Sequence, residues 1–425
     1  MINQDNNIKQ EVESLSKSLT KNLFFDDKDN NIDFFISSLT EYNPYNSTEE
    51  IEEWLAFMNK EKFFSVERID LDKMKKWSFD KNNGDLKHDS GGFFSIKGLK
   101  VETNWGNVSS WTQPIIHQPE IGILGIITQK INGILYFLLQ AKAEPGNINT
   151  YQLSPTVQAT RSNYLQLHGG KSTEYLEYFI DTSLTKVLID QLQSEQGARF
   201  YHKRNRNIII RLKDDYNFSH GENHRWLTLG QIIKLTKKDN TVNMDTRSVI
   251  SSISYEPEKV TDIKQINIDD LKNSINNFSL ISEQNIDLAV KLMISLHPNS
   301  IGLNTSQDIL RKIAKRKFEC ELNSRLIPLN AVKKWKLTNN EIYHPERKYF
   351  SIIGVHIETI NREVGFWDQP IVKQDHPGLV GFILKEINGV IHFLTQLKLE
   401  CGVMDLLEIS PTVQCITSNY DNNKL

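Results

Sequence analysis

The sequence predicts an α+β protein made of two tandem copies of one module, in which mixed sheets are packed by helices. Two observations lead to this prediction. A motif that begins at Trp111 recurs at Trp367, an offset of 256 residues (367 − 111). Short apolar runs of strand length also alternate with segments of helical periodicity. The chain is therefore interpreted as a duplication.

The repeat has a constant offset. Residues 111–164 align with residues 367–420 without a gap, and about 25 of these 54 positions are identical. Ser47 and Thr305 each precede a segment of helical periodicity, where a hydroxyl caps a helix well. Copy one runs from about residue 30 to 253 and copy two begins near residue 283. Copy two reaches Leu425, which corresponds to position 169 of copy one (425 − 256), so we expect copy two to be incomplete.

The expected division of the chain follows from these limits. It comprises a helical lead-in (1–45), a first module (46–253), a linker (254–282) and a second module (283–425). Within copy one, the periodicity predicts strands over residues 94–103, 121–158 and 199–212 and helices over residues 172–193 and 228–237. Asn132 and the glycine that follows it mark a hairpin turn.

Composition excludes several classes of protein. A hydrophobic content of 39%, a charged content of 24% and a net charge of −3 are ordinary for a folded domain and give no nucleic-acid footprint. No run of about 18 apolar residues could span a membrane, and the N-terminus lacks the apolar core of a signal peptide. The three cysteines are odd in number and lack metal spacing, so we expect them to be reduced and the protein to be cytoplasmic.

Six strings of copy one, taken together and in this order, resemble the nucleotide-hexose 2,3-dehydratase family. They are AKAEPGN at Ala141, LSPTVQATRSNY at Leu153, HGG at His168, SEQGARFYHKRNRN at Ser194, HRWLTLGQ at His224 and VNMDTRSV at Val242. The resemblance covers copy one almost completely and copy two until its early end.

The resemblance has consequences for fold and activity. It implies two Nudix-like modules, each an α/β/α sandwich with a mixed sheet. It also implies a hydro-lyase that removes the C2 hydroxyl of dTDP-4-keto-6-deoxyglucose in deoxysugar biosynthesis, without a metal or redox cofactor. The 3,4-diketo product would pass to a separate 3-ketoreductase. We also expect a homodimer.

Hydrolysis of a nucleotide sugar is a less favoured activity. A Nudix hydrolase holds magnesium with a helix dense in glutamates that follows a glycine. The expected helix at 172–193 lacks that pattern, and only Glu195 resembles the terminal acids of such a helix. The sequence therefore argues against hydrolase chemistry.

Elimination of water next to a ketone needs a base at C3, donors for the enolate oxygen and an acid for the departing hydroxyl. Glu144 follows a strand in the turn EPGN and is a candidate base; alternatively it only caps amides of its turn. Tyr164 and His168 are further candidates for proton transfer. The alternatives are a core aromatic for Tyr164 and an exposed loop histidine for His168.

Candidate substrate-binding residues fall into three groups. Thr156 and Gln158 alternate along one strand and could bind sugar hydroxyls, or could satisfy buried backbone groups instead. A basic group could bind the diphosphate or could form a solvated face, and it comprises Lys142, Arg199, Lys203, Arg204, Arg206 and Arg225. Trp111 or Trp226 could stack on the nucleotide base, although a large aromatic is more often part of a core.

We expect copy one to be the active half, because its EPGN turn is intact. The residues of the equivalent turn in copy two are different. There, Cys401 replaces Pro145 and Val403 replaces Asn147. A second hypothesis remains open, in which the chain is an inactive, truncated remnant that only binds a nucleotide sugar.

Overall fold

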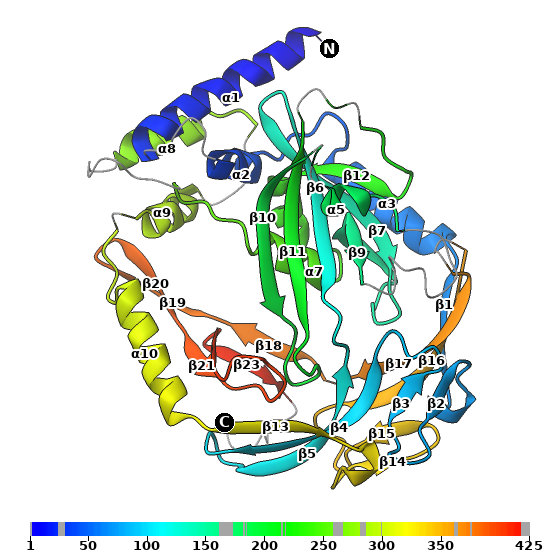
Figure 1. The fold of residues 1–425 in the computed structure, drawn as a ribbon. Coiled ribbons are helices and arrows are strands. Elements are labelled where there is room, and N and C mark those ends of the chain that lie inside the picture. The colour runs from blue at the N-terminus through cyan, green and yellow to red at the C-terminus, as the bar shows by residue number, and fades with distance from the viewer. Residues whose placement is uncertain are drawn as a thin grey trace.

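The computed structural model of the chain shows helices that cover both faces of one central sheet, with strands that pass between the two copies (Figure 1). It describes residues 2–23, 30–160, 173–181, 183, 185–213, 216, 218–257, 267–280, 286–298, 300–360, 364–374 and 376–417.

The central sheet belongs to copy one and is mixed. Its seven strands follow the order β10-β11-β6-β7-β12, with β8 beside β7 and β9 beside β6. β11 runs parallel to β6, whereas the other neighbours are antiparallel. The strands are β6 (Gly122–Ile131), β7 (Ile134–Ala143), β8 (Tyr151–Pro155), β9 (Val157–Ala159), β10 (Thr185–Ser194), β11 (Arg204–Leu212) and β12 (His224–Thr228).

The turn between β6 and β7 confirms the predicted hairpin. Asn132 and Gly133 have φ values of 51° and 87°. Two successive positive φ values are the signature of a type I′ turn, which suits the twist of a two-residue hairpin and favours Asn-Gly. Asn388 and Gly389 repeat the same geometry in copy two, with φ values of 53° and 79°.

The predicted helix over residues 172–193 is wrong. A short helix, α5 (Glu177–Ile180), is followed by β10, which pairs antiparallel with β11. Edge pairing with β11 supplies backbone hydrogen bonds that override the local helical periodicity of this segment. The strand predicted over 199–212 begins only at Arg204, whereas α6 (Leu229–Thr236) confirms the helix predicted over 228–237.

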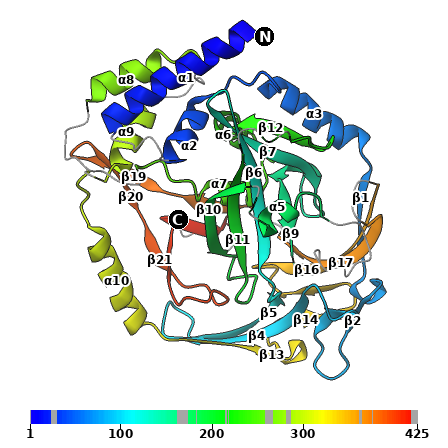
Figure 2. The same cartoon turned by 45° about the horizontal axis from the view of Figure 1, so that its top comes forward.

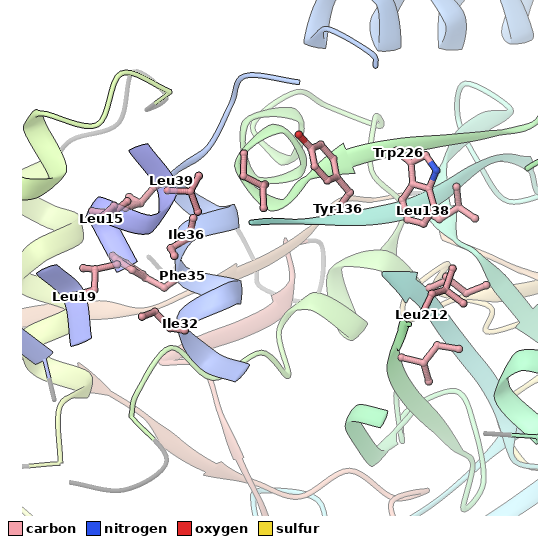
Figure 3. Close-up of a cluster of buried hydrophobic side chains, with 14 of the residues drawn as sticks. Leu15, Leu19, Ile32, Phe35, Ile36, Leu39, Tyr136, Leu138, Leu212 and Trp226 are labelled. Atoms are coloured by element: carbon pink, nitrogen blue, oxygen red, sulfur yellow. The ribbon is translucent and has the colours of Figure 1, made fainter. Parts of the chain in front are cut away.

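Two hydrophobic clusters lie on opposite faces of the central sheet. Ile134, Tyr136 and Leu138 of β7 belong to one cluster, whereas Leu135 and Phe137 belong to the other, as alternation along a strand requires. The first face is covered by α1 (Ile2–Leu23), α2 (Asn30–Leu39), α8 (Ile268–Asn276) and α9 (Ile286–Leu296), and the second by α3 (Thr48–Glu61), α6 and α7 (Met244–Ile250). Figure 3 shows α1 and α2 side chains beside β7 and β12 residues of the first cluster.

The predicted helix caps are confirmed. Ser47 accepts a hydrogen bond from the Glu50 amide at the start of α3, and Glu50 bonds back to Ser47. Thr305 and Asp308 form the same reciprocal pair at the start of α10 (Ser306–Glu319). Each pair satisfies amides that lack partners in the first helical turn.

The two copies exchange a strand. β1 (Phe64–Ile69) of copy one pairs with β16 (Ser351–Thr359) of copy two, and β13 (Leu322–Ile327) of copy two pairs with β4 (Ser95–Thr103) of copy one. Phe64 faces Thr359 and Leu322 faces Thr103, so the two pairings are equivalent under the repeat. Figures 1 and 2 show both exchanges from two directions.

The exchanged strands complete two further sheets. One has the order β1-β16-β15-β14 with β17 beside β16, and the other has the order β13-β4-β3-β2 with β5 beside β4. The remaining strands are β2 (Trp77–Phe79), β3 (Leu86–His88), β5 (Ser110–His117), β14 (Lys336–Leu337), β15 (Glu341–Tyr343) and β17 (Phe366–Lys373). Trp77 of copy one and Leu329 of copy two lie in one hydrophobic cluster. The copies therefore share a core, and the boundaries expected from sequence remain a prediction.

Equivalent glycines mark the places where the copies cross. A Cβ at Gly98 would lie 2.7 Å from Val332 and 2.8 Å from Ile327, and a Cβ at Gly354 would lie 2.9 Å from the Ile69 carbonyl oxygen. Gly98 and Gly354 differ by 256 residues. The same position is thus glycine in both copies because another segment approaches its backbone.

The rest of copy two presents an open apolar face. Its strands form three two-stranded sheets in the described residues, namely β18 (Gly378–Gly381) with β23 (Val413–Ile416), β19 (Ile383–Ile387) with β20 (Val390–Leu394), and β21 (Gln396–Lys398) with β22 (Glu408–Ser410). Val380 and Phe382 are 65% and 49% exposed, whereas their counterparts Leu124 and Ile126 are 6% and 0% exposed. In copy one, this face is covered by α3, α6 and α7.

None of the described helices has an apolar stretch long enough to cross a membrane.

Candidate active site

Five polar residues of copy one gather around Asp245, and we call the six together the polar cluster: Lys142, Glu144, Gln158, Glu195, Lys203 and Asp245. β7 supplies Lys142 and β9 supplies Gln158. Asp245 lies in the first turn of α7. Glu195 directly follows β10 and Lys203 directly precedes β11. The hairpin formed by these two strands is shown in Figure 1.

Glu144 directly follows β7, as the sequence predicts. Its turn is closed by backbone groups, since the Glu144 amide donates to the Thr150 carbonyl oxygen (3.3 Å) and the Asn147 amide donates to the Glu144 carbonyl oxygen (3.0 Å). The Asn147 side chain also donates to Thr150 (2.9 Å). The carboxylate of Glu144 lies 3.8 Å from the ammonium nitrogen of Lys142. The turn is thus closed by backbone groups and the Asn147 side chain, and the Glu144 carboxylate faces Lys142.

The environment of Asp245 favours its protonated form. Burial raises its pKa to about 6, and the negative charge of Glu144 acts in the same direction. The Gln158 side-chain amide donates a hydrogen bond to Asp245 Oδ2 and partly opposes the rise. Asp245 therefore exchanges a proton close to neutral pH, as an acid–base group should.

The position of Asp245 is fixed by the cap of α7. Asn243 accepts a hydrogen bond from the Thr246 amide (2.8 Å) and donates one to the Ser154 hydroxyl (2.8 Å). The Asn243 amide also donates to the Leu153 carbonyl oxygen (3.0 Å). These bonds attach the start of α7 to β8, beside the strand that carries Gln158.

The β10–β11 hairpin brings a further carboxylate and a lysine to Asp245. The Glu195 amide donates to the Lys203 carbonyl oxygen (3.0 Å), and the Asn205 side chain donates to the Glu195 carboxylate (2.5 Å). Lys203 is buried and donates to the Glu120 carbonyl oxygen. Burial lowers the pKa of Lys203, whereas Glu195, Glu120 and Asp245 oppose that effect.

Thr156 has a role within the sheet. It is 2% exposed, its hydroxyl accepts a hydrogen bond from the Ile127 amide (2.9 Å), and it donates to the Leu138 carbonyl oxygen. Thr412 makes the equivalent bonds to Ile383 and Leu394 in copy two. The geometry thus fits the alternative in which Thr156 satisfies backbone groups, and it explains why the Ser-Pro-Thr motif recurs. Substrate binding by Thr156 remains a prediction.

The predicted basic group does not form a single patch. Arg206 makes two hydrogen bonds to Asp190 (2.7 and 2.6 Å), and Arg204 lies two residues earlier in β11. Arg225 donates to the carbonyl oxygens of Glu222 and His224. Of the six basic residues, Lys142 and Lys203 lie in the polar cluster, and a role for the others in substrate binding remains a prediction.

Two predicted site residues lie elsewhere. Arg199 lies over the ring of Phe350 of copy two, with 4.1 Å between the guanidinium carbon and the ring centre. The Trp111 indole donates to Gln113 (2.9 Å) and packs beside Cys401. Trp367 donates to Gln369 at the same distance, so this pair has a structural role in both copies. Tyr164 and His168 fall outside the described residues.

The sequence alone predicts no role for Asp245. For Glu195 it indicates only a resemblance to the terminal acids of a Nudix hydrolase helix. The signal for Asp245 was present in the string VNMDTRSV. His224 is another group that the sequence does not single out: burial lowers its pKa to about 4, so it is neutral near pH 7. Within the described ranges, no three His, Cys, Asp or Glu side chains are grouped as metal ligands would be.

The family model of NDP-hexose 2,3-dehydratases matches the chain twice, over residues 48–253 and 306–424. The chain belongs to this family. The dehydratase family predicted from sequence is thus confirmed, and the first match contains the whole polar cluster.

Three dehydratases named dTDP-4-dehydro-6-deoxy-α-D-glucopyranose 2,3-dehydratase are similar to this chain. The protein from Saccharopolyspora spinosa is 40% identical over 92% of this chain and 76% of its own length. Those from Amycolatopsis orientalis and Streptomyces violaceoruber are 37% and 34% identical, over 88% and 86% of this chain and 71% and 76% of their own lengths. A solved complex of the mouse MUTYH C-terminal domain with human PCNA covers 31% of this chain and 86% of its own, with 12% identity and a TM-score of 0.20, which supports no argument.

Proposed function

We propose that this chain is a dTDP-4-keto-6-deoxyglucose 2,3-dehydratase, a hydro-lyase whose reaction takes place at the polar cluster of copy one. One observation above all supports this assignment. Asp245, with a pKa raised to about 6, lies close enough to Glu144 for the charge of one carboxylate to affect the other. Two carboxyl groups in different environments can divide the roles of acid and base.

The reaction begins at C3 of the sugar. The C4 ketone makes the C3 hydrogen acidic, and Glu144 removes it as a proton, so that the electrons of the C3–H bond form an enolate with the C4 oxygen. Lys142 and the Gln158 amide are donors in the same cluster, and they stabilise the negative charge on that oxygen. The enolate then collapses and the C2–O bond breaks.

Asp245 supplies the proton for the departing C2 hydroxyl, which leaves as water. A raised pKa keeps part of the Asp245 population protonated near neutral pH, while Glu144 acts as the base. The enol that remains at C3 tautomerises to the 3,4-diketone. One molecule of water is lost and no electrons are gained or lost overall, so the reaction needs no external oxidant or reductant.

The assignment also covers the fate of the product, the assembly, the location and the fold. The 3,4-diketone is a reactive product, which suits transfer to a separate 3-ketoreductase. We also propose that two copies of this chain associate into a homodimer. Cys320, Cys401 and Cys415 are free thiols, in keeping with a cytoplasmic location. The helix–sheet–helix layering of copy one is compatible with a Nudix-like module.

Incubation of the full chain with dTDP-4-keto-6-deoxyglucose tests the function. Mass spectrometry should show a product lighter by one water, and the reaction in D2O should place deuterium on the sugar ring. Glu144→Gln and Asp245→Asn should each strongly reduce the yield of product, whereas Asp239→Asn, a change outside the polar cluster, should not. Binding of the substrate without loss of water would instead support a protein that only binds nucleotide sugars.

A further inference from the structure

We propose that the turn of copy two at residues 400–403, which we call the docking turn, positions the β10–β11 hairpin of copy one, and that Glu400 acts through this hairpin on Asp245. Glu400 is thus a positioning residue for the site in the other copy. The inference rests on the function proposed above.

The docking turn holds the tip of the hairpin by its backbone. The Gly197 amide donates to the Glu400 carboxylate (2.8 Å), and the His202 amide donates to the Gly402 carbonyl oxygen (2.6 Å). A hydrogen bond to a charged acceptor is stronger than one between neutral groups. Glu400 therefore fixes a backbone position of copy one.

The packing permits no side chain between the two segments. A Cβ at Gly402 would lie 2.0 Å from the Phe200 carbonyl oxygen and 2.5 Å from that of Gly197. A Cβ at Gly197 would lie 2.7 Å from Val403 and 2.9 Å from the Glu400 Cβ. Each glycine thus brings two backbones into contact, and small displacements of one segment must move the other.

The changes from EPGN to ECGV in copy two fit this contact. Cys401 is 4% exposed, and its sulfur lies 3.6 Å from both the Gly197 carbonyl oxygen and the Gln113 side-chain oxygen. Val403 packs against Gly197 and is 6% exposed. The sequence differences between the two turns therefore reflect the packing role of the turn in copy two.

The hairpin also carries an arginine into copy two. Arg199 lies over Phe350 and donates to the Gln374 side chain (3.2 Å), and Glu400 acts electrostatically on its guanidinium group. These contacts come from the same tip as Gly197. The tip is thus anchored to copy two on both sides.

The residues where the hairpin loop joins its two strands lie at the proposed site. Glu195 and Lys203 face Asp245 from the hairpin, whereas Glu144 and Lys142 face it from β7 and the turn after it. If Glu400 no longer holds the tip, Glu195 and Lys203 shift and water gains access to Asp245. The pKa of Asp245 should then fall toward its ordinary value, because burial is the main cause of its rise.

Cys401 provides a direct report on the contact. In a Cys320→Ser, Cys415→Ser background it is the only cysteine, and burial raises its pKa to about 12, so a disulfide reagent should label it slowly. Glu400→Ala should increase the labelling rate tenfold or more. Glu400→Gln should stay within about threefold of the parent, because its amide oxygen can still accept the Gly197 hydrogen bond. Glu386→Ala, which removes an ion pair with Lys291 elsewhere in copy two, is the control.

Two further measurements separate positioning from a purely structural contact. Glu400→Ala should lower kcat roughly 10- to 100-fold, the scale expected for a misplaced catalytic group, and should move the ionisation of Asp245 in the kcat profile to lower pH. Independently of turnover, the stabilisation that Asp245→Asn gives at pH 8 should shrink by about half or more in the Glu400→Ala background, as coupled sites require.

The outcomes are distinct. If Glu400→Ala speeds the labelling of Cys401 but leaves the coupling to Asp245 unchanged, the docking turn is only an interface contact. If labelling is unchanged, Glu400 does not hold the contact. Absence of turnover in the wild-type chain would contradict the proposed function, while the labelling and coupling results would still decide whether Glu400 acts on Asp245.

Discussion

Replacing Asp245 with asparagine should stabilise the protein at neutral pH while it strongly reduces turnover. Burial and the charge of Glu144 raise the pKa of Asp245 from 3.8 to about 6. At 1.36 kcal/mol per pKa unit, the ionised carboxylate costs the folded state about 3 kcal/mol. Asparagine cannot ionise, and its amide oxygen can still accept the hydrogen bond from Gln158.

The effect has a defined pH dependence. Well below pH 3.8, Asp245 binds its proton in the folded and the unfolded state alike, so it contributes no difference in stability. Between pH 4 and 6 the folded state binds more protons than the unfolded state, and wild-type stability falls as the pH rises. The advantage of Asp245→Asn should thus grow from near zero at pH 4 to about 1–3 kcal/mol at pH 8.

Urea unfolding of wild type and variant at pH 4, 6 and 8 measures this difference. Asp181→Asn is a suitable control, because the Ser183 amide donates to Asp181 (2.9 Å) and lowers its pKa. That control should show the opposite pH trend. An Asp245→Asn variant that is equally destabilised at every pH would refute the assignment of Asp245 as a carboxyl group whose pKa is raised in the folded state.

Four other changes have defined outcomes. Glu144→Gln should lower kcat about 100- to 10,000-fold with little change in the melting temperature, as loss of a general base does; retention of activity by mass spectrometry would exclude it as the base. Gly98→Val should lower the free energy of unfolding in urea by about 1–3 kcal/mol, because the new side chain overpacks against the exchanged strand. Gly146→Ala should change this free energy little, because a Cβ at Gly146 meets no atom within 4 Å. Thr156→Val should lower the free energy of unfolding by about 1–3 kcal/mol. KM should stay unchanged if the Thr156 hydroxyl bonds only to backbone groups of the sheet, and a large rise in KM would show contact with substrate. Phe382→Ser should weaken the fluorescence of a dye that binds apolar surfaces, since this side chain is 49% exposed; an unchanged signal would show that the open face of copy two is covered in solution.

Prediction from sequence succeeded where local rules decide the structure. The hairpin at Asn132 follows from two positive φ values that Asn and Gly accept, and the caps at Ser47 and Thr305 follow from the hydroxyl that each offers to free amides. It failed for β10. That segment has helical periodicity, and only its position beside β11 makes it a strand.

Prediction of the site was partial for a similar reason. Glu144 and Gln158 were identified because their strings are distinctive and repeated. Asp245 lies 87 residues from Gln158, and only the packing of α7 against β8 brings the two side chains together. Arg199 was grouped with its neighbours in sequence, yet the hairpin tip turns it toward copy two.

The sequence by itself determined the duplication, the family and most of the local elements, because these depend on residue identity and on short-range geometry. Tertiary structure alone decided how the copies combine. Strand exchange between β1 and β16 and between β4 and β13, and the contact of Glu400 with Gly197, join residues more than 200 positions apart. Such contacts leave only indirect traces in a sequence, such as a glycine at equivalent positions, since their energy arises from packing between distant segments.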